Sequence, residues 1–182
     1  MWESIFTRMN PARQSTDELI PLVYERLRHM AGRLWASWQV DASLEPTQLV
    51  HETYLRLAAG EPAEGWGGPA HVSAVAAKAM RQILADRARA RGRLKRGGGM
   101  DRVTLSHLGD HRDPVTVLDL DDALRELEGA DPRRAEVLTL RALGGLSVEE
   151  CAQVLGVSPR TVKADFRVAR AWLMVRLSGS SA

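Results

Sequence analysis

Apolar residues recur every three or four positions along most of this chain, which is the period of an α-helix. The segments 17–38, 46–58 and 70–93 each place their large aliphatic residues on one helical face. Pro21 is tolerated because it lies in the first turns of its segment. We find no convincing alternation of period two, which a half-buried strand would show. The pattern therefore predicts an all-α protein.

Helical segments 121–128 and 132–143 are predicted in the C-terminal part, and two closely spaced helices follow them. Ser147 with a glutamate three residues later is a capping box, which begins a helix. Gly156 provides the left-handed residue that ends this helix. Ser158, followed by a proline, then starts the next helix almost at once. The spacing predicts a helix-turn-helix.

The second helix of this motif has an apolar face and an adjacent cationic face, because positions three and four apart lie on one side of a helix. The apolar set is Val162, Phe166, Ala169 and Leu173. The cationic set is Arg160, Lys163, Arg167 and Arg170. A short turn before a helix with outward cations is what insertion into the DNA major groove requires. The alternative is an ordinary helical hairpin with solvated basic residues; the caps, the glycine and the cations together favour DNA binding.

Glycines and polar residues fill positions 97–120, and so long a structureless stretch is unusual inside one compact domain. This stretch is therefore predicted to be a flexible linker between two small helical domains. The first predicted domain comprises residues 1–96. The second comprises residues 121–177 and contains the helix-turn-helix, and a tail follows at 178–182.

Charge is unevenly distributed along the chain, although the net charge is only +2. A basic block at 78–96 precedes an acidic block at 110–131. This order indicates a protein that contacts nucleic acid in some places and avoids it in others. The single cysteine, Cys151, excludes an internal disulfide and is predicted to be a small core residue. No apolar run reaches membrane-spanning length and no signal peptide is apparent, so we expect a cytoplasmic protein without membrane insertion.

Enzyme motifs are weak in this chain. The dipeptide His51-Glu52 matches part of the His-Glu-x-x-His pattern of zinc hydrolases, but Leu55 stands where the second histidine is needed. The other histidines have no ligand spacing, and no phosphate-binding glycine loop or nucleophile motif is present. We therefore expect no catalysis, no metal site and no cofactor.

Several segments resemble parts of bacterial sigma factors. Gln48–Leu57 resembles the segment that binds the RNA polymerase core, and Ala74–Gly99 resembles the helix that melts promoters and reads the −10 element. Asp131–Arg141, Gly145–Glu150 and Thr161–Lys163 resemble the module that reads the −35 element. The chain is thus similar, over nearly its whole length, to the extracytoplasmic-function (ECF) group of the sigma-70 superfamily. The resemblance implies a factor for promoter-specific transcription initiation that also assists duplex opening.

The partners that the resemblance implies are promoter DNA and RNA polymerase core, which is contacted at the clamp helices of its largest subunit and at the flap region. The residues implied to contact the clamp helices are Gln48, His51, Glu52 and Arg56. A mixed polar face suits a reversible interface. From the residues alone, a merely solvated face remains the alternative. An anti-sigma protein is left open as a further partner.

The resemblance implies that the −10 element contacts the loop after the second helix and one face of the third. The implied residues are Trp66, His71, Lys78, Arg81, Gln82 and Arg89. Separated bases need a stacking surface, and Trp66 is the candidate; a core position is its alternative. Lys78 and Arg81 are expected on the outward face of the helix. Val72 and Ser73 stand where related proteins often carry aromatic residues, so the resemblance does not extend to strong promoter melting.

The −35 element is implied to contact the helix-turn-helix. The implied residues are Ser158, Arg160, Thr161, Lys163, Arg167 and Arg170. Arg170 is expected near phosphate and the other cations in the major groove. Ala164 replaces a common basic residue, so the −35 sequence cannot be carried over from relatives. The competing hypothesis is a regulator that binds operators as a dimer and works without polymerase. That hypothesis does not explain the polar face of the second helix or the basic third helix.

Overall fold

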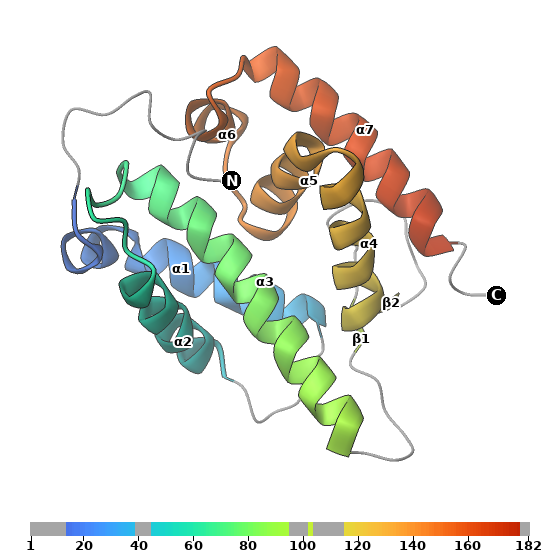
Figure 1. Cartoon of the computed structure of the whole chain (residues 1–182), viewed down its shortest axis with the longest axis horizontal. Helices are drawn as coiled ribbons and strands as arrows, with labels where there is room; N and C mark the ends of the chain where they lie inside the picture. Colours follow the sequence, from blue (N-terminus) through green and yellow to red (C-terminus); the bar gives the residue numbers. More distant parts are fainter. Residues whose placement is uncertain (1–13, 39–44, 95–101, 104–114, 179–182) are drawn as a thin grey trace.

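The computed structural model describes residues 14–38, 45–94, 102–103 and 115–178, and it confirms the predicted all-α class. The three N-terminal helices are α1 (Thr16–Trp38), α2 (Pro46–Ala59) and α3 (Pro69–Leu94) (Figure 1). The C-terminal elements are α4 (Val117–Ala130), α5 (Pro132–Leu138), the π-helical turn η3 (Thr139–Leu143), α6 (Val148–Leu155) and α7 (Pro159–Ser178). The helix predicted at 132–143 is therefore an α-helix that widens in its last turn.

The linker predicted at 97–120 ends too late. The structure begins α4 at Val117, and the Oγ1 of Thr116 caps it by accepting a hydrogen bond from the backbone N of Asp119 at 3.0 Å. Residues 117–120 are helical because Val117 and Leu120, one turn apart, are both buried in the core.

Two short strands lie within the rest of the predicted linker. These strands, β1 (Arg102–Val103) and β2 (Val115–Thr116), pair in an antiparallel arrangement. The remaining linker positions, 97–101 and 104–114, lie outside the described residues, as do positions 179–182 of the tail.

Side-chain caps fix where the first two helices begin. The backbone N of Ser15 donates to Glu18 Oε2 at 2.8 Å, and the backbone N of Glu18 donates to Ser15 Oγ at 3.3 Å. At α2, the backbone N of Glu45 donates to Gln48 Oε1 at 3.2 Å. Such contacts satisfy amide groups that have no partner in the first helical turn.

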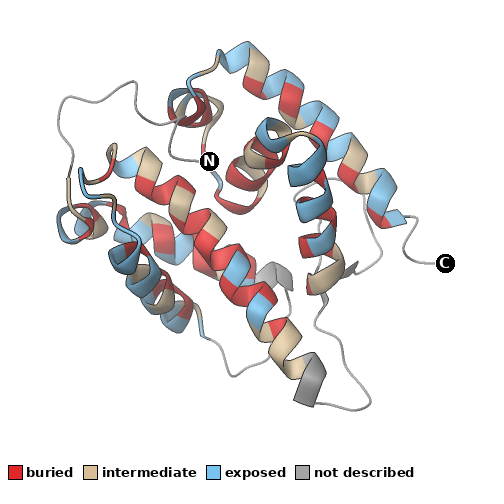
Figure 2. Ribbon diagram, viewed as in Figure 1, coloured by how far each residue is buried: buried red, intermediate tan, exposed pale blue. Residues whose placement is uncertain are grey.

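The long helix α3 lies between α1 and α2 on one side and the C-terminal helices on the other (Figure 1). Buried positions therefore follow much of its length (Figure 2). One core cluster joins Leu27 of α1, Met80 of α3 and Leu124 of α4. In a second cluster, Ala74 of α3 packs with Leu140 and other residues of the C-terminal helices. The N-terminal and C-terminal helices thus share a packed joint along α3.

Candidate nucleic-acid interfaces

The predicted helix-turn-helix corresponds to α6 and α7, which a short turn joins. The backbone N of Ser147 donates to Glu150 Oε2 at 2.8 Å, and the backbone N of Glu150 donates to Ser147 Oγ at 3.0 Å. Gly156 ends α6 with a φ of +65°, a left-handed conformation that glycine adopts without steric cost. Ser158 Oγ then accepts a hydrogen bond from the backbone N of Thr161 at 3.1 Å. These local contacts set the turn and therefore the direction of α7.

The cations of α7 project away from the fold. The exposed members of this α7 surface are Arg160, Lys163, Arg167 and Arg170. Within the part of the chain that the structure describes, no ion pair restrains any of the four. Ser158 is also exposed, and Thr161 is half-buried, at the N-terminus of the helix. The structure therefore brings all the predicted −35 residues together on one accessible surface.

Asp165 faces inward from α7 and anchors this surface, a role that the sequence analysis does not assign. The residue is 4% exposed, and its Oδ2 accepts a hydrogen bond from Arg133 Nε at 2.7 Å. This hydrogen bond raises the pKa of Arg133. The signal was present in the sequence, because Asp165 lies three residues after Val162 and four before Ala169, on the apolar face of the helix.

On α2, the four predicted polymerase contacts lie opposite buried residues such as Leu49. Gln48, His51 and Arg56 are exposed and Glu52 is half-buried. Glu52 forms an ion pair with Arg87 of α3, and Arg56 Nη2 donates to Asp86 Oδ2 of α3 at 3.2 Å. Gln48 and His51 line an open groove together with the Glu52–Arg87 pair. The polar face of α2 is therefore partly tied to α3 and partly accessible.

Trp66 is a core residue in this structure, which is the alternative that the sequence left open beside a stacking surface. Its side chain is only 1% exposed, and its Nε1 donates to Thr16 Oγ1 at 2.8 Å. Its backbone exchanges two hydrogen bonds with Gln14, at 2.8 and 3.2 Å. A buried indole is stable when its N–H has a partner, and Thr16 supplies it.

His71 fixes the entry into α3 from within the fold. Its Nδ1 accepts a hydrogen bond from the backbone N of Gly67 at 3.0 Å, and its ring lies edge-on to Trp66 with centroids 5.5 Å apart. The neighbouring Val72 and Ser73 are both fully buried. These two positions therefore offer DNA no surface in this conformation.

The remaining predicted −10 residues line one side of α3. Lys78 and Arg89 are half-buried and Gln82 is exposed. Lys78 Nζ bonds the carboxylate of Glu136 in α5 at 2.5 Å. Arg81 is 4% exposed, so its predicted outward position is wrong. The physical reason is that α4 packs against this face, which a helical projection of α3 alone cannot show.

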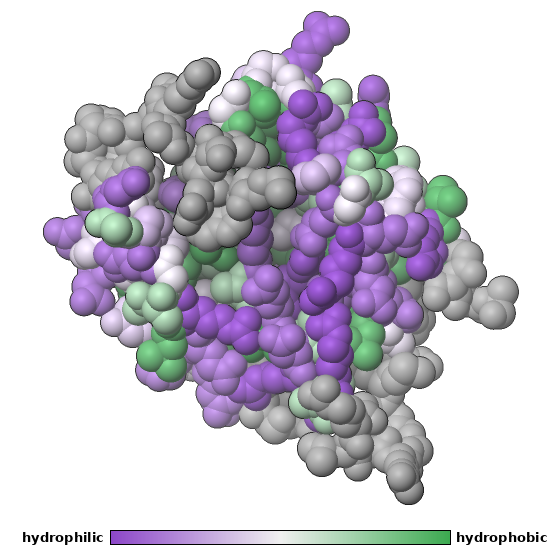
Figure 3. Space-filling model, in the orientation of Figure 1, coloured by the Kyte–Doolittle hydropathy of each residue, from purple (hydrophilic) through white to green (hydrophobic). Residues whose placement is uncertain are grey.

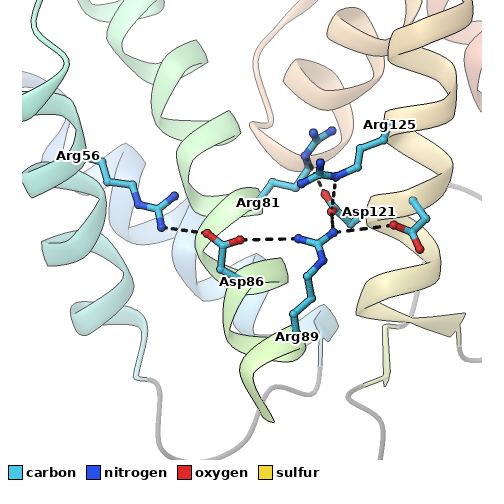
Figure 4. A network of polar contacts seen from close by, with 7 residues as sticks. Arg56, Arg81, Asp86, Arg89, Asp121 and Arg125 are labelled. Carbon is cyan, nitrogen blue, oxygen red and sulfur yellow. Dashed lines mark hydrogen bonds and ion pairs between the residues drawn. The ribbon is translucent and has the colours of Figure 1, made fainter. Parts of the chain in front are cut away.

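A network of charged side chains joins α3 to α4 (Figure 4). At its centre Asp121 of α4, 0% exposed, bonds Arg89 and accepts from Arg125 Nε at 2.8 Å. The bond to Asp121 raises the pKa of Arg125. Arg81 adds a contact from its Nε to Asp121 Oδ1 at 3.4 Å. In the same orientation as Figure 1, Figure 3 shows hydrophilic side chains gathered across the middle of the molecule.

Two other classes of site receive no support from the described ranges. The described ranges contain no group of three or more histidine, cysteine, aspartate or glutamate residues that could hold a metal ion. Among the helices that the structure describes, none is both long enough and apolar enough to span a bilayer.

Comparisons with known proteins place the chain. A family model described as ECF sigma factor matches residues 9–179. The solved structure of CnrH in complex with the cytosolic domain of CnrY is similar, with 22% identity, a TM-score of 0.41, and coverage of 91% of this chain and 89% of that one. The sigma factor RpoE from Bartonella quintana, in complex with the anti-sigma factor NepR, shows 21% identity, a TM-score of 0.40, and coverage of 89% and 96%. None of the curated proteins matches significantly. The family match confirms the resemblance seen in the sequence: the chain belongs to the ECF sigma factor family, which acts in transcription initiation.

Proposed function

We propose that this protein binds RNA polymerase core and directs it to promoters by contacting a −35 element with α7 and a −10 element with α3. The observation that carries the proposal is the α7 surface: four exposed cations on a helix that a capped, glycine-ended turn presents to solvent. Such a helix fits the major groove, where arginine and lysine donate to guanine.

On the α7 surface, some side chains would position the protein on the DNA backbone and others would contact the bases. Ser158 and Thr161 lie at the N-terminus of α7, where hydroxyl and amide groups suit phosphate oxygens. Arg160 and Lys163 follow in the first turns and are the side chains that contact base edges. Arg170 lies further along the helix and contacts the backbone, which adds affinity without sequence information.

The exposed part of the α2 face is the proposed contact with the polymerase clamp helices. Gln48 and His51 are accessible, whereas Glu52 and Arg56 are held in place by ion pairs to α3. Side chains ordered before binding lose less conformational freedom on association. A polar interface of this kind also supports release after initiation.

The −10 contact uses α3 at its exposed and half-buried positions. Gln82 and Lys78 line a groove of about 630 Å³ that also includes Arg56 and Glu136. Trp66 lies among the lining residues but is buried, so cations rather than an exposed indole make the first contact with the strand. The groove is lined mostly by apolar residues, so Lys78 and Arg56 supply the attraction for the phosphates of single-stranded DNA before any base is captured.

Runoff transcription with purified core polymerase and a promoter library tests the proposal. We expect product that depends on this chain, and a loss of at least about tenfold in the Arg160→Ala/Lys163→Ala double variant, because base and phosphate contacts are both removed. Arg176→Ala is the control, since Arg176 lies on the same helix but pairs with Glu126. Binding to duplex DNA without association with core would instead support the operator-binding regulator.

A further inference from the structure

We propose that the residues at the start of α1 position one wall of the groove for the −10 strand, and that Thr16 determines −10 specificity through Trp66. This inference rests on the −10 contact proposed for α3. The entry segment (residues 14–17) pairs with the loop that joins α2 to α3, and Gly60 and Trp66 of this loop line the groove. Thr16 is therefore a positioning residue that acts on DNA through the loop.

The loop at 60–68 is intrinsically free to change shape. Four of its nine residues are glycine, which has more backbone freedom than any other residue. Gly65 has a φ of +77°, in the left-handed region that favours glycine. A local hydrogen bond from the backbone N of Gly65 to the carbonyl oxygen of Pro62, at 2.7 Å, closes one turn of the loop. Contacts from elsewhere in the chain are needed to decide where the remainder of the loop lies.

The entry segment supplies such contacts from about fifty residues away in the sequence. Gln14 exchanges two backbone hydrogen bonds with Trp66, at 2.8 and 3.2 Å. Thr16 Oγ1 accepts a hydrogen bond from Trp66 Nε1 at 2.8 Å, and the backbone N of Thr16 donates to Glu61 Oε2 at 2.9 Å. A Cβ placed on Gly65 would lie 2.9 Å from the carbonyl oxygen of Gln14, so the two backbones are in direct contact. One short segment thus holds the loop near its start and near its centre.

The same segment is also attached to the helix that is proposed to bind polymerase. Tyr54 of α2 donates a hydrogen bond from its hydroxyl to Asp17 Oδ1 at 2.9 Å, and this hydrogen bond raises the pKa of Tyr54. The entry segment therefore connects α2 to the loop. The groove wall consequently has a fixed position relative to the polymerase-binding face.

Trp66 transmits the effect of Thr16 to the groove. Trp66 is 1% exposed, and it lines the groove together with Lys78 and Gln82 of α3. Removal of the Thr16 hydroxyl leaves the indole N–H without its partner, and a buried donor without a partner is costly. The indole then turns its N–H toward water, and the wall of the groove moves with it. Because a displacement of about 1 Å is enough to loosen a binding site, the groove holds the −10 bases less selectively.

Promoter selection tests the positioning role, with the full-length chain, purified core polymerase and a library randomised at both elements. The test variant is Thr16→Val, which keeps the shape of the side chain and removes its hydroxyl. Thr16→Ser is the rescue, because it restores an oxygen at this position. Thr53→Val is the matched control, since Thr53 is also buried but its hydroxyl donates to the carbonyl oxygen of Leu49 within α2, at 2.7 Å.

A second pair of variants tests the other side-chain contact of the entry segment. Glu61 is exposed, so its substitution leaves the core unchanged. Glu61→Ala removes the acceptor for the backbone N of Thr16, whereas Glu61→Gln keeps an acceptor oxygen there.

We expect the preference for the selected −10 bases to fall about tenfold in Thr16→Val and about threefold in Glu61→Ala, as loss of one buried and one more exposed hydrogen bond implies. Thr16→Ser, Glu61→Gln and Thr53→Val should keep the −10 preference, and all variants should keep the −35 preference. The indole N–H of Trp66, followed in ¹⁵N–¹H spectra and assigned with Trp66→Phe, should exchange with solvent at least about tenfold faster in Thr16→Val.

An unchanged −10 preference in Thr16→Val overturns the positioning role and leaves the −10 contact of α3 in place. Equal losses of −10 and −35 preference, or an equal loss in Thr53→Val, show a structural role alone and overturn it as well. If Thr16→Val does not fold, the second pair decides, and equal −10 preferences in Glu61→Ala and Glu61→Gln overturn the inference. If the unsubstituted protein selects no −10 sequence, the DNA role of α3 itself is wrong and the inference is wrong with it.

Discussion

The cations of α7 and those of α3 have the same chemistry but opposite surroundings. The four on the α7 surface, Arg160, Lys163, Arg167 and Arg170, are exposed and make no ion pair within the described ranges, because a local turn projects this part of the helix outward. On α3, Lys78, Arg81 and Arg89 are paired with carboxylates of helices distant in the sequence; Arg81 is buried, and Lys78 and Arg89 are half-buried. A cationic stripe on a helix therefore does not by itself define an available DNA surface. Availability is decided by what the rest of the chain places above the stripe.

The largest effect on stability is expected at Trp66, a buried residue in the loop that leads into α3. Trp66→Ala should lower the free energy of unfolding by about 3–5 kcal/mol, the usual cost of removing a large buried ring. Denaturant unfolding followed by circular dichroism measures this. Trp66→Phe keeps most of the ring volume and loses the bond to Thr16, so its cost should be smaller, about 1–2 kcal/mol. If Trp66→Ala unfolds like the unsubstituted protein but melts promoters poorly, the indole is a DNA contact and not a core residue.

The next effect separates two kinds of contact on α7. Arg160→Ala should remove about 1–3 kcal/mol of discrimination between bases and so change the selected −35 sequence. Arg170→Ala should weaken binding to all sequences alike, because a phosphate contact carries no sequence information. Selection of bound duplexes from a random library, followed by sequencing, measures both. Equal and sequence-blind losses in the two variants would contradict the assignment of Arg160 to a base.

The turn that presents α7 gives a smaller effect on stability. Gly156→Ala should cost about 1–2 kcal/mol, because a residue with a Cβ is strained at a positive φ. Gly129→Ala is the matched control, since this helical glycine has no atom within 4 Å of an added Cβ and no positive φ. We expect that control to be neutral or to stabilise by up to about 1 kcal/mol. Thermal unfolding should show a lower Tm for Gly156→Ala and an unchanged or higher Tm for Gly129→Ala.

The same comparison explains what could be predicted from the sequence. The start of α6 at Ser147, its end at Gly156 and the capped start of α7 depend on contacts three or four residues apart, so the pattern predicts them correctly. The inward position of Asp165 was accessible in the same way, from its spacing to Val162 and Ala169. Local rules are sufficient where neighbours in the sequence are also the physical partners.

Long-range packing accounts for the failures. The partner of the Trp66 N–H is Thr16, fifty residues away, and an indole suits a core and a stacking surface equally well. Arg81 is covered by α4, forty residues later in the chain, through Asp121. A helical projection separates apolar from polar faces but does not show which polar face another helix will cover. The sequence therefore predicts which side chains lie along α3 but not how far each of them is exposed.

The last prediction needs no substitution, because the native thiol of Cys151 reports on the packed joint between the N-terminal and C-terminal helices. It shares a core cluster with Ala74 of α3, and burial raises the pKa of its thiol to about 11 from the usual 9.0. At pH 8 the folded protein should hold about a hundredfold less thiolate than a free thiol, and reaction with iodoacetamide should slow by at least that factor. Because the folded pKa is the higher one, the stability from this group is complete below about pH 9 and falls as the pH rises toward 11. A reaction rate at pH 8 within about threefold of that of a free thiol would contradict the burial of Cys151 in this cluster.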